Sequence, residues 1–300
     1  MRVIQGYFGN FIKGSQFNRD LLFASAWQYK KYNPEDEIIL YAPEIDLQNL
    51  DLFKYDGVER PWSNLHVLPV DYHRPLYDMV RYELMSIQEE DFTWLDPDVL
   101  TFVKIPELKP GEIDFIGYGN EGKENLYPDP QEKDFQKFLS KSLYRYHYHN
   151  NAYNMGFCRT TAELGTIIGM ECLFFLKELS KMMTYWNPRD VRYHHFCSQS
   201  VPAMVLERFH KVHKDIAEFY PEFEHPVWHL VWGDAKMPDG TKLSTVKAGN
   251  KSLKDKAKSE MFWHKLSNFI IEKRGISWEE LCEFYLDFYS KVNNSKPALL

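Results

Sequence analysis

Several features that would assign a protein class at once are missing from this chain of 300 residues. It has no apolar run of the roughly 18 residues that span a membrane, and its opening, MRVIQGYFGN, lacks a signal peptide's order of basic, apolar and small residues. It also lacks internal repeats and low-complexity tracts. With 44% hydrophobic and 26% charged residues, the sequence predicts a soluble globular protein, which we expect to be cytoplasmic.

Cysteine is scarce, and its pattern argues against two common roles. The four cysteines, Cys158, Cys172, Cys197 and Cys282, form no C-x-x-C pair of the kind that metal and redox sites use. They are widely spaced and lie in mostly apolar sequence. We therefore expect buried thiols in a reducing compartment.

An excess of basic charge is also absent, because the formal net charge is -7. An acidic chain is a poor general binder of phosphate backbones, so nucleic acid is not an expected partner. The stretch 236–265 is a local exception, with eight lysines against three acidic residues. This stretch is either a solvated loop and helix face or a surface that meets an anion.

Apolar patterns along the chain alternate between those of strands and those of helices. Short apolar runs predict strands in 2–9, 37–43, 65–70, 92–95, 113–119, 153–158 and 226–233. The runs 37–43 and 65–70 have the continuous apolar pattern of strands that are buried on both faces. Helical spacing predicts helices from Asn18 to the Asn33-Pro34 pair, from Ser277, and in 76–89, 135–144, 163–183, 199–209 and 259–273. The helix 76–89 has an apolar stripe at Leu76, Val80, Leu84 and Ile87, and the helix 163–183 is predicted despite Gly165 and Gly169. This order predicts an α/β fold with a mainly parallel central sheet flanked by helices. We expect one domain at 1–250 and a helical extension at 251–300, packed on the same domain.

Two aspartates follow the predicted strand 92–95 in the stretch TWLDPDVL. Because side chains alternate faces along a strand, Asp96 and Asp98 point the same way, and Pro97 ends the ladder because it lacks a donor. Two converging carboxylates repel unless a divalent cation lies between them. Oxygen ligands suit Mn²⁺ or Mg²⁺, which commonly recruit substrate phosphates. The alternative is that both side chains cap the following turn.

The wider stretch LYDMVRYELMSIQEEDFTWLDPDVL, residues 76–100, resembles the donor site of GT-A glycosyltransferases, which use a nucleotide-sugar and a divalent metal. The glycogenin-like family is similar in a helix with a basic residue, here Arg81, before an aromatic-Leu-Asp-x-Asp strand that ends in Asp96 and Asp98. The family of Golgi mannosyltransferases and toxin glucosyltransferases is similar in an Asp-x-x-Arg-Tyr helix that begins here at Asp78. The resemblance implies the GT-A fold.

The resemblance also implies donor contacts for this helix. Asp78 and Arg81 would belong to the donor site, with the guanidinium of Arg81 reaching a phosphate or a sugar hydroxyl. By spacing alone, the two residues are i,i+3 neighbours on a face turned away from the apolar stripe. A simple surface ion pair is therefore the alternative.

Two further motifs resemble the glycogenin-like family. YNMGF matches an Asn-x-Gly strand, which implies that Asn154 and Gly156 lie at the donor sugar. FCSQSVPAMVL matches an Asp-Gln pair that opens a helix, which implies donor binding by Gln199, although Ser198 stands where that family has aspartate. The local alternatives are a strand glycine beside a chance asparagine and a plain helix N-terminus.

The stretch HLVWGDAKMP resembles a carboxyl-terminal His-x-x-Gly-x-x-Lys-Pro signature of these enzymes. It implies that His229 is the third metal ligand, and that Gly233 and Lys236 belong to the donor site with the lysine on the pyrophosphate. His229 lies one residue farther from the glycine than in that signature. Asp234 or water therefore stays open as the third ligand, and His229 is otherwise a strand histidine with ordinary hydrogen bonds.

Aromatic residues end the first predicted strand, where this superfamily usually holds the nucleotide base. Tyr7 and Phe8 are therefore candidates for the donor site, or else core residues. The other histidines, including the pair His194 and His195, have no cysteine or carboxylate at ligand spacing, and we expect them to be structural.

Together these patterns predict a metal-dependent glycosyltransferase that moves a sugar from a nucleotide-diphosphate sugar, UDP-linked by resemblance, to a glycan or another hydroxyl acceptor. Mn²⁺ or Mg²⁺ is the expected cofactor, and Asp96, Asp98, Arg81 and Gln199 are the expected catalytic residues. A modified nucleobase stays among the open acceptors. Two other functions fit the same patterns: a sugar-phosphate nucleotidyltransferase, or a non-catalytic domain that binds a nucleotide-sugar or a glycan.

Overall fold

The computed structural model describes residues 1–7, 16–48, 60–68, 78–119, 127–142, 146–148, 151–182, 188–223 and 226–229. The chain divides into two compact units. The amino-terminal unit contains Val3–Leu68, Leu95–Ile105 and Tyr220–Leu300, and the central unit contains Met1–Arg2, Pro69–Trp94 and Pro106–Phe219. The predicted boundary between 1–250 and 251–300 lies outside the described residues.

Seven strands form one mixed sheet in the order β3-β2-β1-β4-β7-β6-β8. They are β1 (Arg2–Gly6), β2 (Glu37–Ala42), β3 (Asn64–Val67), β4 (Phe92–Leu95), β6 (Phe115–Gly117), β7 (Phe157–Thr160) and β8 (His213–Asp215). The pairs β2–β3 and β6–β8 are parallel, whereas β6 and β7 are antiparallel. Strands β5 (Val99–Thr101) and β9 (Val227–His229) form a separate antiparallel ribbon.

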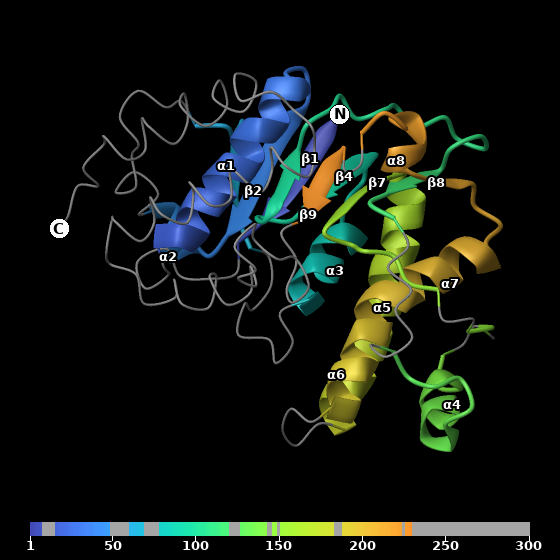
Figure 1. Cartoon of the computed structure of the whole chain (residues 1–300). Coiled ribbons are helices and arrows are strands. Elements are labelled where there is room, and N and C mark those ends of the chain that lie inside the picture. The colour runs from blue at the N-terminus through green and yellow to red at the C-terminus, as the bar shows by residue number, and fades with distance from the viewer. Residues whose placement is uncertain are drawn as a thin grey trace, which may run out of the picture. The chain divides into compact units, whose positions relative to one another are not determined.

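Helices accompany the strands of both units, which confirms the predicted α/β class. The amino-terminal unit has α1 (Gln16–Tyr32) and α2 (Glu44–Gln48), drawn in blue in Figure 1. The central unit has α3 (Asp78–Ser86), α4 (Lys133–Leu139), α5 (Ala162–Met182), α6 (Pro188–His195), α7 (Val201–Arg208) and α8 (Ile216–Phe219). Among the described residues, no helix combines the length and the apolarity that a membrane crossing requires.

Helix α1 ends where the sequence predicts, at the Asn33-Pro34 pair. The side-chain amide of Asn33 donates to the carbonyl of Tyr29, 3.2 Å away, so it satisfies an orphan acceptor of the last turn. Its side-chain oxygen accepts from the backbone N–H of Ile105 at 2.8 Å. The residue that stops the helix thus also ties it to the segment after β5.

Strand β3 differs from the prediction for its run, LHVLPV, of a strand buried on both faces. All four residues of β3 are exposed, and Val67 is 53% exposed. The reason is its place at the end of the sheet order, where a strand has a neighbour on one side only. The apolar run shows that a strand forms, but it does not show where in the sheet the strand lies.

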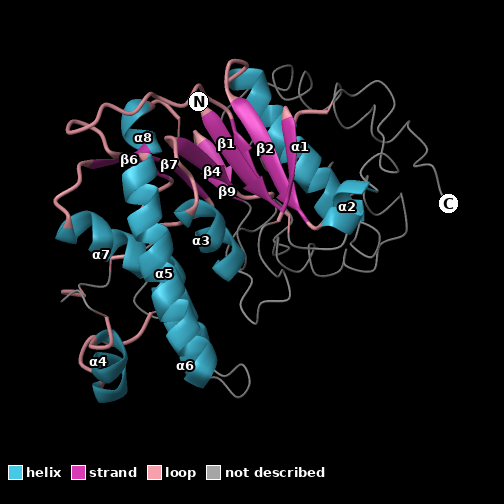
Figure 2. Ribbon diagram, turned by 180° about the vertical axis from the view of Figure 1, so that it is seen from behind, coloured by secondary structure: helices cyan, strands magenta, loops and turns pink. Residues whose placement is uncertain are grey.

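Helices α3 and α5 pack closely in the central unit, where Figure 2 shows both. Two glycines of α5 permit this approach. A Cβ atom added at Gly169 would lie 2.7 Å from the carbonyl oxygen of Tyr82 and 2.8 Å from the backbone nitrogen of Ser86. A Cβ added at Gly165 would lie 2.5 Å from the ring of Phe92. The glycines that weaken the helical pattern in the sequence are therefore contact points for the neighbouring helix and strand.

The predicted apolar stripe of α3 is confirmed in part. Val80 and Leu84 are fully buried, but Ile87 lies beyond the end of the helix and is 50% exposed. Asp78, which the pattern places on an outward face, is buried instead. Cys158, Cys172 and Cys197 are buried free thiols, as expected.

A candidate metal centre and the residues of the donor motif

The Asp-Pro-Asp motif forms a tight turn at the carboxyl end of β4. The backbone N–H of Val99 donates to the carbonyl of Asp96 at 3.1 Å, which closes a four-residue turn with Pro97 in its second position. Proline is favoured there because its fixed φ suits the turn. Strand β5 begins directly after the turn, so both carboxylates belong to the link between two strands.

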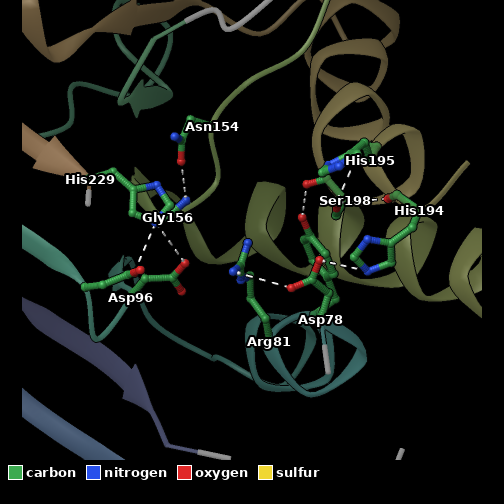
Figure 3. A network of polar contacts seen from close by, with 11 residues as sticks. Asp78, Arg81, Asp96, Asn154, Gly156, His194, His195, Ser198 and His229 are labelled. Atoms are coloured by element: carbon green, nitrogen blue, oxygen red, sulfur yellow. Dashed lines mark hydrogen bonds and ion pairs between the residues drawn. The ribbon is translucent and has the colours of Figure 1, made fainter. Parts of the chain in front are cut away.

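The pairing of β5 with β9 brings a third side chain to this turn. His229, the last residue of β9, lies opposite Val99 in the antiparallel register. Its Nε2 atom lies 3.1 Å from Asp98 Oδ1 and 3.8 Å from Asp96 Oδ2 (Figure 3 labels Asp96 and His229). The sequence places His229 with the two aspartates by resemblance alone, and the structure brings it there across 131 positions of sequence.

These three residues form a group with the geometry of a metal site. One ligand atom from each residue lies within 4.8 Å of the others. In an octahedral shell with bonds of about 2.1 Å, neighbouring ligand atoms lie roughly 3 Å apart and opposite ones roughly 4.2 Å apart. The separations of 3.1 and 3.8 Å therefore fit one ion after small side-chain adjustments.

The surroundings of the group also favour cation binding. The side chains of Asp96, Asp98 and His229 are 10, 19 and 14% exposed, so little water screens the repulsion between the carboxylates. Two carboxylates and one imidazole are a donor set for a divalent ion. The imidazole favours a transition ion over Mg²⁺, because Mg²⁺ is a hard ion that takes oxygen ligands, whereas nitrogen is a softer donor.

The Asp78–Arg81 pair on α3 is buried rather than a surface ion pair. An Nη atom of Arg81 lies 3.5 Å from Asp78 Oδ1, and the two side chains are 11 and 5% exposed. On its other side, Asp78 Oδ2 lies 3.2 Å from Nε2 of His194 (Figure 3). Burial raises the pKa of the Asp78 carboxyl, but the charge of Arg81 and the contact with His194 outweigh it and hold that pKa below its usual range.

His194 is a partner that sequence reasoning missed. It follows α3 by more than a hundred residues, so no local spacing links it to Asp78. The segment after it is a π-helix, Phe196–Ser200, between α6 and α7. The hydroxyl of Ser198, at the position of the family's aspartate, donates to the carbonyl of His194 at 2.9 Å. π-Helical turns often mark functional segments of a helix.

Gln199 lies inside this π-helical segment and not at the start of a helix, contrary to the prediction. The hydroxyl of Tyr127 donates to its side-chain oxygen at 2.5 Å, and its carbonyl accepts from the backbone of Tyr153 at 3.0 Å. The Ser-Val-Pro sequence that follows resembles a helix start, and Pro202 lies in the first turn of α7, where proline is tolerated.

Asn154 and Gly156 lie in a turn just before β7, whereas the sequence predicts that both belong to a strand over 153–158. The side-chain oxygen of Asn154 accepts from the backbone N–H of Gly156 at 2.9 Å (Figure 3). Asparagine commonly forms this local bond in turns. Asn154 is only 1% exposed.

The remaining predicted residues are divided between the core and the part of the chain that is not described. Tyr7 follows β1 and is 5% exposed, with its backbone N–H donating to Tyr41. Phe8, Gly233, Asp234 and Lys236 lie outside the described residues.

No protein-family model matches this chain, and no curated protein sequence is significantly similar to it. Among solved structures, the galactosyltransferase LgtC in complex with donor and acceptor sugar analogues is 14% identical, with a TM-score of 0.43, and the match covers 85% of this chain and 97% of that chain. The apo form of the glycosyltransferase GlyE from Streptococcus pneumoniae TIGR4 is 11% identical, with a TM-score of 0.44, and the match covers 91% of this chain and 64% of that chain. Both of these proteins are glycosyltransferases.

Proposed function

We propose that this chain is a metal-dependent glycosyltransferase that transfers a sugar from a nucleotide-diphosphate sugar, preferably UDP-linked, to a hydroxyl acceptor. The observation that carries the proposal is the group of Asp96, Asp98 and His229 at the carboxyl end of β4. Ligands of open α/β sheets bind at that end of the strands. An Asp-x-Asp pattern is common by chance in a sequence. A histidine that strand pairing places beside both aspartates is much less common.

In this proposal, Asp96, Asp98 and His229 hold Mn²⁺ in preference to Mg²⁺. The bound ion would supply electrostatic neutralisation of the diphosphate leaving group. The low exposure of the three side chains supports this role, because charge interactions are stronger where water is excluded. Gly233 and Lys236 stay predictions for the donor site.

The residues of the central unit receive their proposed roles from the sequence resemblance. Arg81 would bind a phosphate or a sugar hydroxyl of the donor, and Asp78 would fix the orientation of its guanidinium through their contact of 3.5 Å. Asn154 and Gln199 would bind the donor sugar. The hydrogen bonds that orient both amides support these roles, because a pre-positioned amide loses little freedom on binding.

The first test is a thermal-shift screen of nucleoside diphosphates with and without Mn²⁺. A ligand at about 100 times its Kd stabilises the folded state by about 2.7 kcal/mol, which is easily measured. We expect UDP to stabilise the chain only when Mn²⁺ is present, and Asp98→Asn to remove that effect. Asp134→Asn, which changes an exposed aspartate of α4, is the matched control and should behave as the unmodified chain does. Unchanged metal-dependent stabilisation in Asp98→Asn would contradict the metal site.

Hydrolysis of nucleotide-sugars in Mn²⁺ separates the three candidate functions. A glycosyltransferase releases free sugar slowly when no acceptor is present, whereas a nucleotidyltransferase forms none and requires pyrophosphate to consume the donor. A binding domain shows stabilisation by the donor and no turnover. Slow release of free sugar that Asp98→Asn abolishes is the expected result.

A further inference from the structure

We propose that Trp62, Gln5 and Ser25 form a relay of buried hydrogen bonds that positions Asp96 for metal binding, an inference that rests on the metal site of the proposed function. The indole N–H of Trp62 donates to Gln5 Oε1 at 2.7 Å. The amide of Gln5 donates to Ser25 Oγ at 3.2 Å, and the hydroxyl of Ser25 donates to the main-chain carbonyl of Asp96 at 3.1 Å. These are positioning residues, because none of them is among the metal ligands.

Chemistry fixes the direction of every bond in this relay. An indole nitrogen can only donate, so Trp62 forces the oxygen of the Gln5 amide to face it. The NH₂ group of the same amide then faces Ser25 and occupies an acceptor position of its hydroxyl. The hydroxyl hydrogen of Ser25 is left to point at the carbonyl of Asp96. The relay therefore has one consistent arrangement of donors and acceptors.

The relay reaches the metal site through the backbone. The carbonyl of Asp96 accepts both the turn-closing N–H of Val99 and the hydroxyl of Ser25. A carbonyl oxygen has two lone pairs, and both are engaged. One hydrogen bond from the turn and one from helix α1 therefore hold the peptide plane that follows Asp96. A fixed peptide plane limits the directions in which the Asp96 side chain can point. His229 is held independently, through the pairing of β9 with β5.

Burial makes the relay sensitive to the loss of one member. Gln5 and Ser25 are fully buried and Trp62 is 5% exposed, so water does not readily replace a lost partner. All three residues and Asp96 belong to the amino-terminal unit. A buried polar chain that ends on the backbone of a ligand resembles the outer-shell contacts that tune metal affinity.

The experiment measures Mn²⁺ binding to the full-length chain without nucleotide, by titration calorimetry and by the electron paramagnetic resonance of free Mn²⁺. Ser25→Ala should weaken Mn²⁺ binding about tenfold, as is usual when an outer-shell contact is lost. Ser86→Ala is the matched control, since it deletes another serine hydroxyl that donates to a main-chain carbonyl, at 2.8 Å in α3. It should leave the Mn²⁺ affinity unchanged.

A double variant separates positioning from general destabilisation. Trp62→Phe keeps an aromatic side chain but removes the N–H that orients Gln5, so it should weaken Mn²⁺ binding less than Ser25→Ala does. If the residues act in series, Trp62→Phe should add nothing to the effect of Ser25→Ala. Trp62→Phe alone carries the test if Ser25→Ala does not fold.

Each outcome decides between the two inferences. If the unmodified chain binds no Mn²⁺, the proposed metal site is wrong. If the unmodified chain binds Mn²⁺ and the relay variants bind it equally well, the relay is wrong and the metal site stands. Equal weakening in Ser86→Ala would also overturn the relay, because it would trace the effect to stability alone.

Discussion

Three side chains of the amino-terminal unit carry the proposed chemistry. Asp96 and Asp98 are separated by a proline that shapes their turn, and His229 reaches them from β9. Each aspartate supplies a hard oxygen ligand, while the imidazole adds a nitrogen that distinguishes between divalent ions. The choice of metal is therefore a property of His229 more than of the two aspartates.

This reasoning predicts a change in metal preference when His229 is replaced. His229→Ala should lower the affinity for Mn²⁺ at least tenfold and the affinity for Mg²⁺ less, because the imidazole favours the transition ion. Competition between the two ions in a calorimetric titration measures the ratio. His213→Ala, which removes an exposed histidine, is the control. An unchanged Mn²⁺ affinity in His229→Ala would instead favour water or Asp234 as the third ligand.

A second prediction for a single residue concerns His195. Burial lowers the pKa of His195 below its ordinary value of 6.5, and the neighbouring His194 lowers it further, while Asp78 raises it. The unfolded chain therefore takes up this proton at a higher pH than the folded chain does. His195 should therefore cost no stability above pH 6.5, and the free energy of unfolding should fall as the pH drops below that value.

Urea unfolding between pH 5 and pH 8 tests this dependence. His195→Phe keeps a ring beside Tyr127 but cannot take up a proton, so its free energy of unfolding should fall less steeply below pH 6.5. If the two proteins lose stability in parallel, His195 does not contribute to the pH dependence.

At the scale of elements, the packing of α3 against α5 places the buried Asp78–Arg81 pair. The two helices approach closely at Gly169, where an added Cβ atom would meet Tyr82 and Ser86 of α3. A buried ion pair is costly to break, because removing one partner leaves an unpaired charge in the interior. On the surface, the Asp78–Arg81 ion pair would contribute little to stability. In the interior, its loss would be costly.

Gly169→Ala should destabilise the fold by about 1–3 kcal/mol, since the added methyl group overlaps backbone atoms of α3 that cannot move aside. In an isolated helix the same change is favourable by up to about 1 kcal/mol, so the sign of the effect is diagnostic. Chemical denaturation measures it. Met170→Ala, at the neighbouring exposed position, should change stability by less than about 0.5 kcal/mol. A stabilising effect of Gly169→Ala would show that the helices separate easily.

At the scale of the whole molecule, the candidate metal ligands and their relay belong to one unit, while the Arg81 and Gln199 clusters belong to the other. Metal binding should accordingly protect the backbone of one unit before any donor is present. Binding to the folded state slows the opening of the segments that form the site.

Hydrogen exchange with Mn²⁺ alone tests this division. Amides of Val99–Thr101 and Val227–His229 should exchange more slowly with the ion, whereas those of α5 should be unaffected. Asp98→Asn is the control that should abolish the protection. Protection confined to the central unit would contradict the assignment of the metal to Asp96, Asp98 and His229.

The local features of this protein could be predicted from its amino-acid sequence. Periodicity located β2, β4, α3 and α5, and the Asn33-Pro34 pair marked the end of α1. The end of β4 at the Asp-Pro-Asp motif was also predicted, because Pro97 lacks a donor for the strand ladder. These features depend on residues that lie within a few positions of one another.

The contacts between residues that lie far apart in the sequence could be seen only in the folded chain. It placed His229 on the aspartates through the register of β9 with β5, buried Asp78 between Arg81 and His194, and put β3 at the edge of the sheet. The spacing of residues along the sequence does not predict such contacts. They depend on how strands pair and helices pack between segments that can lie more than a hundred residues apart. The relay from Trp62 to Asp96 belongs to the same class, since four separate segments must fold together before its bonds exist.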